Sequence, residues 1–253
     1  MKEKQNHPLR NVMMVIEYDG TDYCGWQSQA NGVTIQSVIE KCVQKMVGKK
    51  THISASGRTD SGVHAMGQVA NVKARFPVDD ETLVIALNSM LPPDIKIQSA
   101  RTVSNDFHAI KNAKKKTYQY MILNKNTPSA LSARTAWHVP NKLSTPKMRR
   151  AAKMLLGKHD FASFMGRNSS VKTTVREIFS IEILRKGDMI IVDVTGNGFL
   201  KYMVRIIVGT LVEIGKGRFS VDDMKKILKA RNRKAAGLTA PAKGLLLKEV
   251  NYQ

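Results

Sequence analysis

The sequence of 253 residues has few of the features that mark disulfide-rich, metal-binding or membrane-spanning proteins. Its two cysteines, Cys24 and Cys42, argue against a disulfide framework and a cysteine-based metal site. No apolar run approaches the roughly 20 residues that a membrane-spanning helix needs. A glycine-rich nucleotide-binding signature and a metal-ligand cluster are also missing, so we expect no cofactor and no metal. The polar N-terminus lacks an apolar signal region, which predicts a cytoplasmic location.

Acidic residues are scarce relative to basic ones. The chain holds 41 Lys and Arg against 20 Asp and Glu, a formal net charge of +21. Such an excess favours a polyanionic partner, because neutralising phosphates releases counterions. The charge is spread along the whole chain, so folded surfaces must carry it. Nucleic acid is therefore the favoured partner, while an anionic membrane and a solvated basic surface are the alternatives.

Hydrophobic periodicity predicts an α+β protein. Strands are expected over residues 11–18, 51–55, 68–76, 95–103, 114–123, 175–184, 189–195 and 244–252. Helices are expected over residues 35–47, 80–91, 146–156, 200–214 and 221–230. Thr34 is placed to cap the first helix and Gly48 to end it. Cys42 falls on the apolar face of that helix, and Gly157 is the expected cap of the third.

The order of these elements repeats. Each half reads β-α-β-β-α-β, which is the split βαβ plan of ferredoxin-like units. We therefore expect two ferredoxin-like halves with antiparallel sheets and a cleft between them. The N-terminal half covers residues 1–105 and the C-terminal half residues 106–253.

One loop carries the strongest sequence signal for chemistry. The stretch Ser56–His64 joins two predicted strands, and two glycines bracket Arg58 and Asp60. Glycine permits sharp turns and the close approach of a ligand, so this spacing suits a loop with functional side chains. The alternative is an Asp that caps a turn beside a solvated Arg.

The longer string Ser56–Val69 resembles the catalytic loop of the tRNA pseudouridine synthase A (TruA) family. Further segments resemble motifs of the same family in the same order along the chain: Tyr18–Gln29, Lys116–Tyr120, Gly198–Gly209 and Pro241–Leu245. At position 61 this chain has Ser where the family is expected to have Ala. Because both residues are small, we expect activity to persist.

The resemblance implies that Asp60 is the catalytic carboxylate. It could act as a nucleophile at the sugar or the base, or as a base in proton removal. Arg205 would keep this carboxylate ionised in a partly dry pocket, since a neighbouring guanidinium favours the charged form. A flipped uridine needs an aromatic face, for which Tyr118 is expected, and a side chain in the vacated space, for which Arg58 is expected. Ordinary alternatives are core packing for Tyr118 and an Arg205 that extends to solvent.

Four lysines near the junction of the halves are expected to meet RNA phosphates, although a solvated charge run is the usual interpretation. They are Lys111, Lys114, Lys115 and Lys116. His64 is expected to be a structural loop residue rather than a catalytic one.

The resemblance implies an isomerase that converts uridine to pseudouridine at positions 38–40 of the tRNA anticodon arm, as a homodimer and without a cofactor or a membrane. Two alternatives stay open: a synthase acting on another RNA, and a non-catalytic RNA-binding protein.

Overall fold

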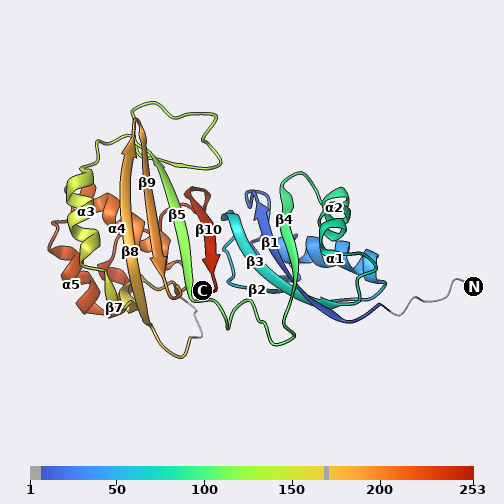
Figure 1. Cartoon of the computed structure of the whole chain (residues 1–253). Helices are drawn as coiled ribbons and strands as arrows, with labels where there is room; N and C mark the ends of the chain where they lie inside the picture. The colour runs from blue at the N-terminus through green and yellow to red at the C-terminus, as the bar shows by residue number, and fades with distance from the viewer. Residues whose placement is uncertain (1–6, 168–170) are drawn as a thin grey trace, which may run out of the picture. The chain divides into compact units, whose positions relative to one another are not determined.

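The computed structural model describes residues 7–167 and 171–253. The chain divides into two compact units (Figure 1). The first holds the described residues up to Lys114 together with Leu247–Gln253, and the second holds Lys115–Leu246. The expected halves, 1–105 and 106–253, thus differ from these units both at the junction and at the C-terminus. Residues 1–6, part of the N-terminus that lacks an apolar run, lie outside the described residues.

The first unit follows the split βαβ plan. Its elements are β1 (Arg10–Tyr18), α1 (Ile35–Val47), β2 (Ser54–Ala55), β3 (His64–Ala74), α2 (Asp80–Met90) and β4 (Ile95–Val103). β1 pairs with both β3 and β4, and β2 pairs with β3, all antiparallel. The two strands joined by α1 are therefore separated by β3, and those joined by α2 are separated by β1. The predicted α+β fold with antiparallel strands is confirmed.

Local sequence explains the bounds of α1. The Thr34 side chain accepts a hydrogen bond from the Ser37 backbone N–H, and the Ser37 hydroxyl accepts one from the Thr34 N–H, both at 3.2 Å. This pair satisfies two of the donors that a helix start leaves without intrahelical partners. At the other end Gly48 adopts a φ of 72°, which glycine tolerates and other residues resist.

The core of the first unit lies between its helices and its sheet. Ile35 and Ile39 of α1 and Leu83 and Leu87 of α2 are fully buried. Burying an aliphatic side chain of this size contributes about 1.5–3 kcal/mol. Cys42 is buried as expected, whereas Cys24 is exposed.

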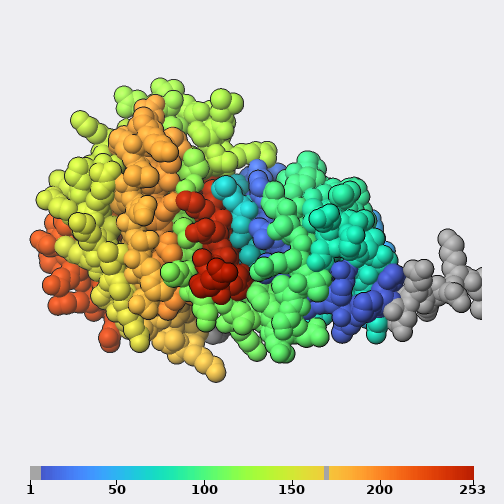
Figure 2. All heavy atoms as spheres, viewed as in Figure 1, coloured from blue at the N-terminus to red at the C-terminus, as the bar shows by residue number. Residues whose placement is uncertain are grey.

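The second unit repeats the plan with additions. Its elements are β5 (Lys115–Leu123), β6 (Trp137–His138), α3 (Thr145–Lys153), β7 (Gly157–Asp160), η1 (Ala162–Phe164), β8 (Val175–Lys186), β9 (Met189–Gly196), α4 (Met203–Gly215), α5 (Asp223–Ala230), η2 (Arg233–Ala235), η3 (Ala242–Gly244) and the start of β10 (Leu245–Asn251). β9 lies between β5 and β8, antiparallel to both, and β7 extends the sheet beyond β8. Figure 2 shows the outer surface of β8, in orange, with no helix over it.

The largest differences from the expected helix bounds are at the end of α3 and the start of α4. α3 ends at Lys153, with Met154 as its C-cap, so Gly157 does not cap it and instead begins β7 with a φ of 88°. Pairing of Gly157 with Ile178 of β8 explains the change, because tertiary strand pairing overrides a local helix pattern. α4 begins at Met203, after Tyr202 in a left-handed conformation with a φ of 62°.

No helix in the described ranges is both long and apolar enough to cross a membrane.

Candidate active site

The loop between β2 and β3, residues 56–63, is held at several backbone positions. The Ser56 N–H donates to the Val69 carbonyl at 2.7 Å, and the Trp26 N–H donates to the Thr59 carbonyl at 3.1 Å. The Val63 N–H donates to the Asp60 carbonyl at 3.1 Å, which closes a turn that begins at Asp60. The backbone before Asp60 is therefore tied to other segments of the first unit, and the backbone after it is closed into a turn within the loop.

A buried side-chain network lies directly beneath this loop. The Tyr18 and Thr59 hydroxyl oxygens are 2.8 Å apart, and Gln68 Nε2 donates to the Gly57 carbonyl at 2.9 Å and toward Tyr18 Oη at 3.5 Å. Gln68 Oε1 accepts from the Ser56 hydroxyl at 2.8 Å. Burial, opposed by the hydrogen bonds to Thr59 and Gln68, raises the pKa of Tyr18 to about 12, so the phenol stays protonated and able to donate.

A second chain segment packs closely on the loop. Gly25 has a φ of 87°, and a Cβ atom there would lie 2.6 Å from the Thr59 carbonyl oxygen. Only glycine fits such an approach without moving the backbone next to Asp60. The Ser61 hydroxyl, at the position where the family is expected to have Ala, donates to the Tyr23 carbonyl at 3.0 Å. The Ser at this position therefore adds a bond between the two segments.

The predicted site residues of the first unit differ in exposure. Asp60 is half-buried and Arg58 is exposed. His64 was expected to be a loop residue, but it begins β3, and its side chain is buried. Its Nδ1 accepts from the Gly20 N–H at 3.1 Å and lies 3.0 Å from a carboxylate oxygen of Asp19, contacts typical of a structural role.

Tyr118 belongs to the second unit, on β5 opposite Val194 of β9. Its side chain is 8% exposed, and its ring packs edge to face against Phe199 with centroids 5.2 Å apart. Such pairs contribute about 0.5–1.5 kcal/mol beyond the area that they bury. The ring is thus buried and held in one orientation against Phe199.

Arg205 lies in the first turn of α4. Its Nε donates to the Ala240 carbonyl at 2.7 Å, and the Ala240 N–H donates to the Arg205 carbonyl at 3.1 Å. Its guanidinium carbon is 4.9 Å from the centroid of the Tyr202 ring, within the range of a cation–π contact. The positive charge also acts on Tyr120, whose pKa is raised mainly by burial and lowered in part by Arg205. The Arg205 guanidinium is therefore held against the protein by specific contacts.

The four lysines of the basic run are divided between the two units. Lys111 and Lys114 belong to the first unit and Lys115 and Lys116 to the second. Since neighbouring residues of a strand point to opposite faces, Lys115 and Lys116 of β5 face different ways. Lys115 Nζ lies 5.6 Å from the Phe179 ring centroid, whereas Lys116 is half-buried and burial lowers its pKa to about 8.

Within residues 7–167 and 171–253 there is no group of three or more His, Cys, Asp or Glu side chains placed to hold a metal ion.

Comparison with known proteins gives a consistent result. The profile of the tRNA pseudouridine synthase family matches residues 14–110 and 151–253. The chain is 46% identical over 244 residues to tRNA pseudouridine synthase A of Acetivibrio thermocellus, covering 96% of this chain and 100% of that one. It is 44% identical over the same length to tRNA pseudouridine synthase A of Geotalea daltonii, with the same coverage. The chain therefore belongs to the tRNA pseudouridine synthase family.

Among solved structures, a chain of a Cbf5–Nop10–Gar1 complex is similar, with a TM-score of 0.37 and 13% identity over 79% of this chain and 45% of that one.

Sequence reasoning missed the supports of the Asp60 loop. Tyr18 precedes Thr59 by 41 residues and Gln68 by 50, and it meets them only because β1 pairs with β3. One sequence signal was available: polar Gln68 lies on the same face of the predicted strand 68–76 as the apolar Ala70, Val72 and Ala74, and a buried amide needs hydrogen-bonding partners.

Proposed function

We propose that this protein isomerises uridine to pseudouridine at positions 38–40 of the tRNA anticodon arm, in the cytoplasm, with Asp60 as the nucleophile. The observation that carries the proposal is the Asp60 turn, anchored by the buried Tyr18–Thr59–Gln68 network, in a chain that matches the family profile through this region. A catalytic group must be held within a fraction of an ångström of its working geometry, and this network supplies that support.

The reaction needs no second reactant. The N1–C1′ bond of uridine breaks, the C5–C1′ bond forms, C5 loses its proton and N1 gains one. Atoms and electrons therefore balance within the nucleotide. What the protein must supply is a carboxylate near the reacting carbons and a site for proton transfer. Asp60 has the carboxylate, and its half-buried position limits competing water without removing it wholly from solvent.

The remaining predicted residues are given supporting roles in this proposal. Tyr118 offers an aromatic face to the flipped uracil, and the contact with Phe199 limits its rotation. Exposed Arg58 fills the space that the flipped nucleotide leaves. Arg205 supplies positive charge for the Asp60 carboxylate, and its hydrogen bond to Ala240 limits its motion.

RNA binding is proposed to depend on backbone contacts by Lys111, Lys114, Lys115 and Lys116 and on a homodimer of the 28.2 kDa chain. Reversing the charges of Lys114, Lys115 and Lys116 should weaken tRNA binding and flatten its salt dependence. An unchanged salt slope would place the RNA elsewhere. Sedimentation at micromolar concentration should give twice the chain mass, and a monomer would contradict the dimer.

The deciding experiment is pseudouridine mapping on an unmodified tRNA with uridines at positions 38, 39 and 40. Native protein, Asp60→Ala and Asp60→Asn are compared, with tRNA affinity measured for each. Product with native protein only, at nearly unchanged affinity, supports both reaction and residue. Residual turnover by either variant would exclude Asp60 as the nucleophile. Tight binding without product from native protein would instead favour another RNA target or a non-catalytic binder.

A further inference from the structure

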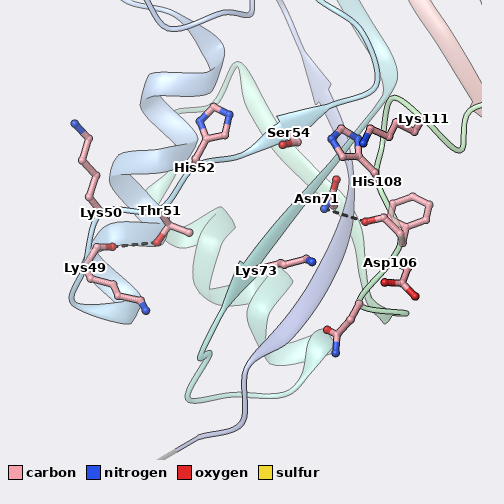
Figure 3. A pocket seen from close by; sticks show the side chains of 12 residues that line it. Lys49, Lys50, Thr51, His52, Ser54, Asn71, Lys73, Asp106, His108 and Lys111 are labelled. Atoms are coloured by element: carbon pink, nitrogen blue, oxygen red, sulfur yellow. Dashed lines mark hydrogen bonds between the residues drawn. The ribbon is translucent and has the colours of Figure 1, made fainter.

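The first unit contains a groove of about 630 Å³, and none of the residues that line it belongs to the Asp60 loop (Figure 3). Ser54 of β2 and Asn71 and Lys73 of β3 line it from the sheet. Residues 49–52, which follow α1, form one side, and residues 105–111, which follow β4, form the other. Its volume is within the range of pockets that bind small molecules or parts of larger ligands.

Two buried asparagines fix one wall of this groove. Asn11 Nδ2 donates to the Ser104 and Phe107 carbonyls at 2.8 and 2.9 Å. Asn71 Nδ2 donates to Asn11 Oδ1 at 2.9 Å, and Asn71 Oδ1 accepts from the Ala109 N–H at 2.9 Å. Because these bonds are made within the protein, the wall is held in place before any ligand binds, which lowers the entropic cost of binding.

The lining of the groove is strongly cationic. It contains four lysines against one acidic side chain, Asp106. The lysines are Lys49, Lys50, Lys73 and Lys111, and all four are exposed. Figure 3 shows Lys49 and Lys50 on one side, Lys111 with His108 on the other, and Lys73 between them. Only one lining residue, Phe107, is apolar, so the groove suits a charged ligand better than an acyl chain or a stacked base.

We propose that this groove binds backbone phosphates of an RNA strand outside the reacting uridine. Lysines on opposite walls with a polar floor between them would contact phosphates without reading bases, so the contribution would be independent of sequence. That the RNA is tRNA rests on the proposed function. The groove adds Lys49, Lys50 and Lys73 to the residues that contact RNA and gives Lys111 a defined location.

The test compares two double variants with equal charge. Lys50→Gln/Lys73→Gln removes two exposed groove lysines that are not among the contacts proposed above, whereas Lys41→Gln/Lys45→Gln removes two exposed lysines of α1 in the same unit. The affinity for unmodified tRNA is measured from about 50 to 200 mM salt. The groove variant should make the slope of log K against log salt less negative by about two, because each removed lysine leaves one phosphate without its cation. The control should change it by less than half as much, since it removes only long-range charge.

Equal slope changes in the two double variants would contradict the proposal that the groove binds RNA. Single-turnover pseudouridine formation at saturating protein separates this result from a failure of the proposed function. If native protein forms no pseudouridine, the proposed function is contradicted, while the salt slopes still decide whether the groove binds RNA. If native protein is active but the two double variants change the slope equally, only the proposal that the groove binds RNA is contradicted. A groove variant that keeps its single-turnover rate while losing affinity supports both.

A substitution of opposite sign provides an independent check. Asp106→Asn removes the one carboxylate of the groove and should tighten tRNA binding. Glu81→Gln, which removes an exposed carboxylate of α2, is the control. Tighter binding by Asp106→Asn alone supports the groove, whereas equal gains in both variants contradict it.

Discussion

The hydroxyl oxygens of Tyr18 and Thr59 lie 2.8 Å apart in the buried interior of the first unit. Thr59 is the residue immediately before Asp60. This bond joins the end of β1 to the loop between β2 and β3. Tyr18 Oη also lies within 3.5 Å of Gln68 Nε2, so the phenol connects three segments. The position of the Asp60 backbone thus depends on a side chain that precedes Thr59 by 41 residues.

The first prediction concerns this bond. Tyr18→Phe leaves the buried Thr59 hydroxyl without its partner, which should cost about 1–3 kcal/mol in the free energy of unfolding. A loop displaced by a fraction of an ångström should lower turnover by up to about 10²-fold. Urea unfolding and single-turnover kinetics measure the two effects. Tyr252→Phe, which loses the bond to the Ala109 carbonyl at 2.8 Å, is the control and should lose stability without losing turnover. Equal turnover losses would contradict a specific role for Tyr18.

The second prediction concerns Gly25. Gly25→Ala should reduce both stability and turnover, because its Cβ would press on the Thr59 carbonyl at 2.6 Å. Gly48→Ala is the matched control: its φ is also positive, at 72°, but a Cβ there has open space. The control should cost only the backbone strain, about 1–2 kcal/mol, and keep native turnover. If Gly25→Ala behaves like Gly48→Ala, close packing on the Asp60 loop does not matter for activity.

The third prediction concerns pH. Burial lowers the pKa of Lys116 to about 8, below its ordinary value of 10.5. Between these values the unfolded state binds more protons, so the contribution of Lys116 to stability rises with pH. Below pH 8 the lysine is charged in both states, and its burial destabilises the fold. Lys116→Met should therefore stabilise the protein most near pH 7, with the gain shrinking toward pH 10. Unfolding curves across this range measure the gain in the free energy of unfolding. A constant gain would exclude the shifted titration.

The fourth prediction separates two roles of Arg205. Both Arg205→Lys and Arg205→Met lose the bond from Nε to the Ala240 carbonyl, which should cost each about 1.5–3 kcal/mol. Only the lysine keeps a positive charge. If that charge assists Asp60, Arg205→Lys should retain more single-turnover activity than Arg205→Met at similar stability. Equal activities would reduce Arg205 to a structural residue.

Several features followed from sequence because their causes lie within a few residues. Thr34 and Ser37 start α1, and Gly48 ends it, through contacts local to the helix. Ser220 and Asp223, three residues apart, exchange reciprocal hydrogen bonds, from the Ser220 N–H at 2.8 Å and the Asp223 N–H at 3.2 Å. The loop of Asp60 was likewise visible, because a run of adjacent residues carries its motif.

Other features depended on contacts between distant segments. Gly157 is a glycine where a helix C-cap was expected, but it belongs to β7 because it pairs with Ile178 of β8. Lys115 and Lys116 are adjacent in the sequence, yet strand geometry turns them to opposite faces of the sheet. Lys73 and Lys111 line one groove only because two buried asparagines hold the chain after β4 against the sheet. Short-range hydrogen bonds and backbone preferences depend on residues that are adjacent in the sequence, so the sequence alone determines them. Burial, strand pairing and the grouping of charges depend on contacts between distant segments, which only the folded chain brings together.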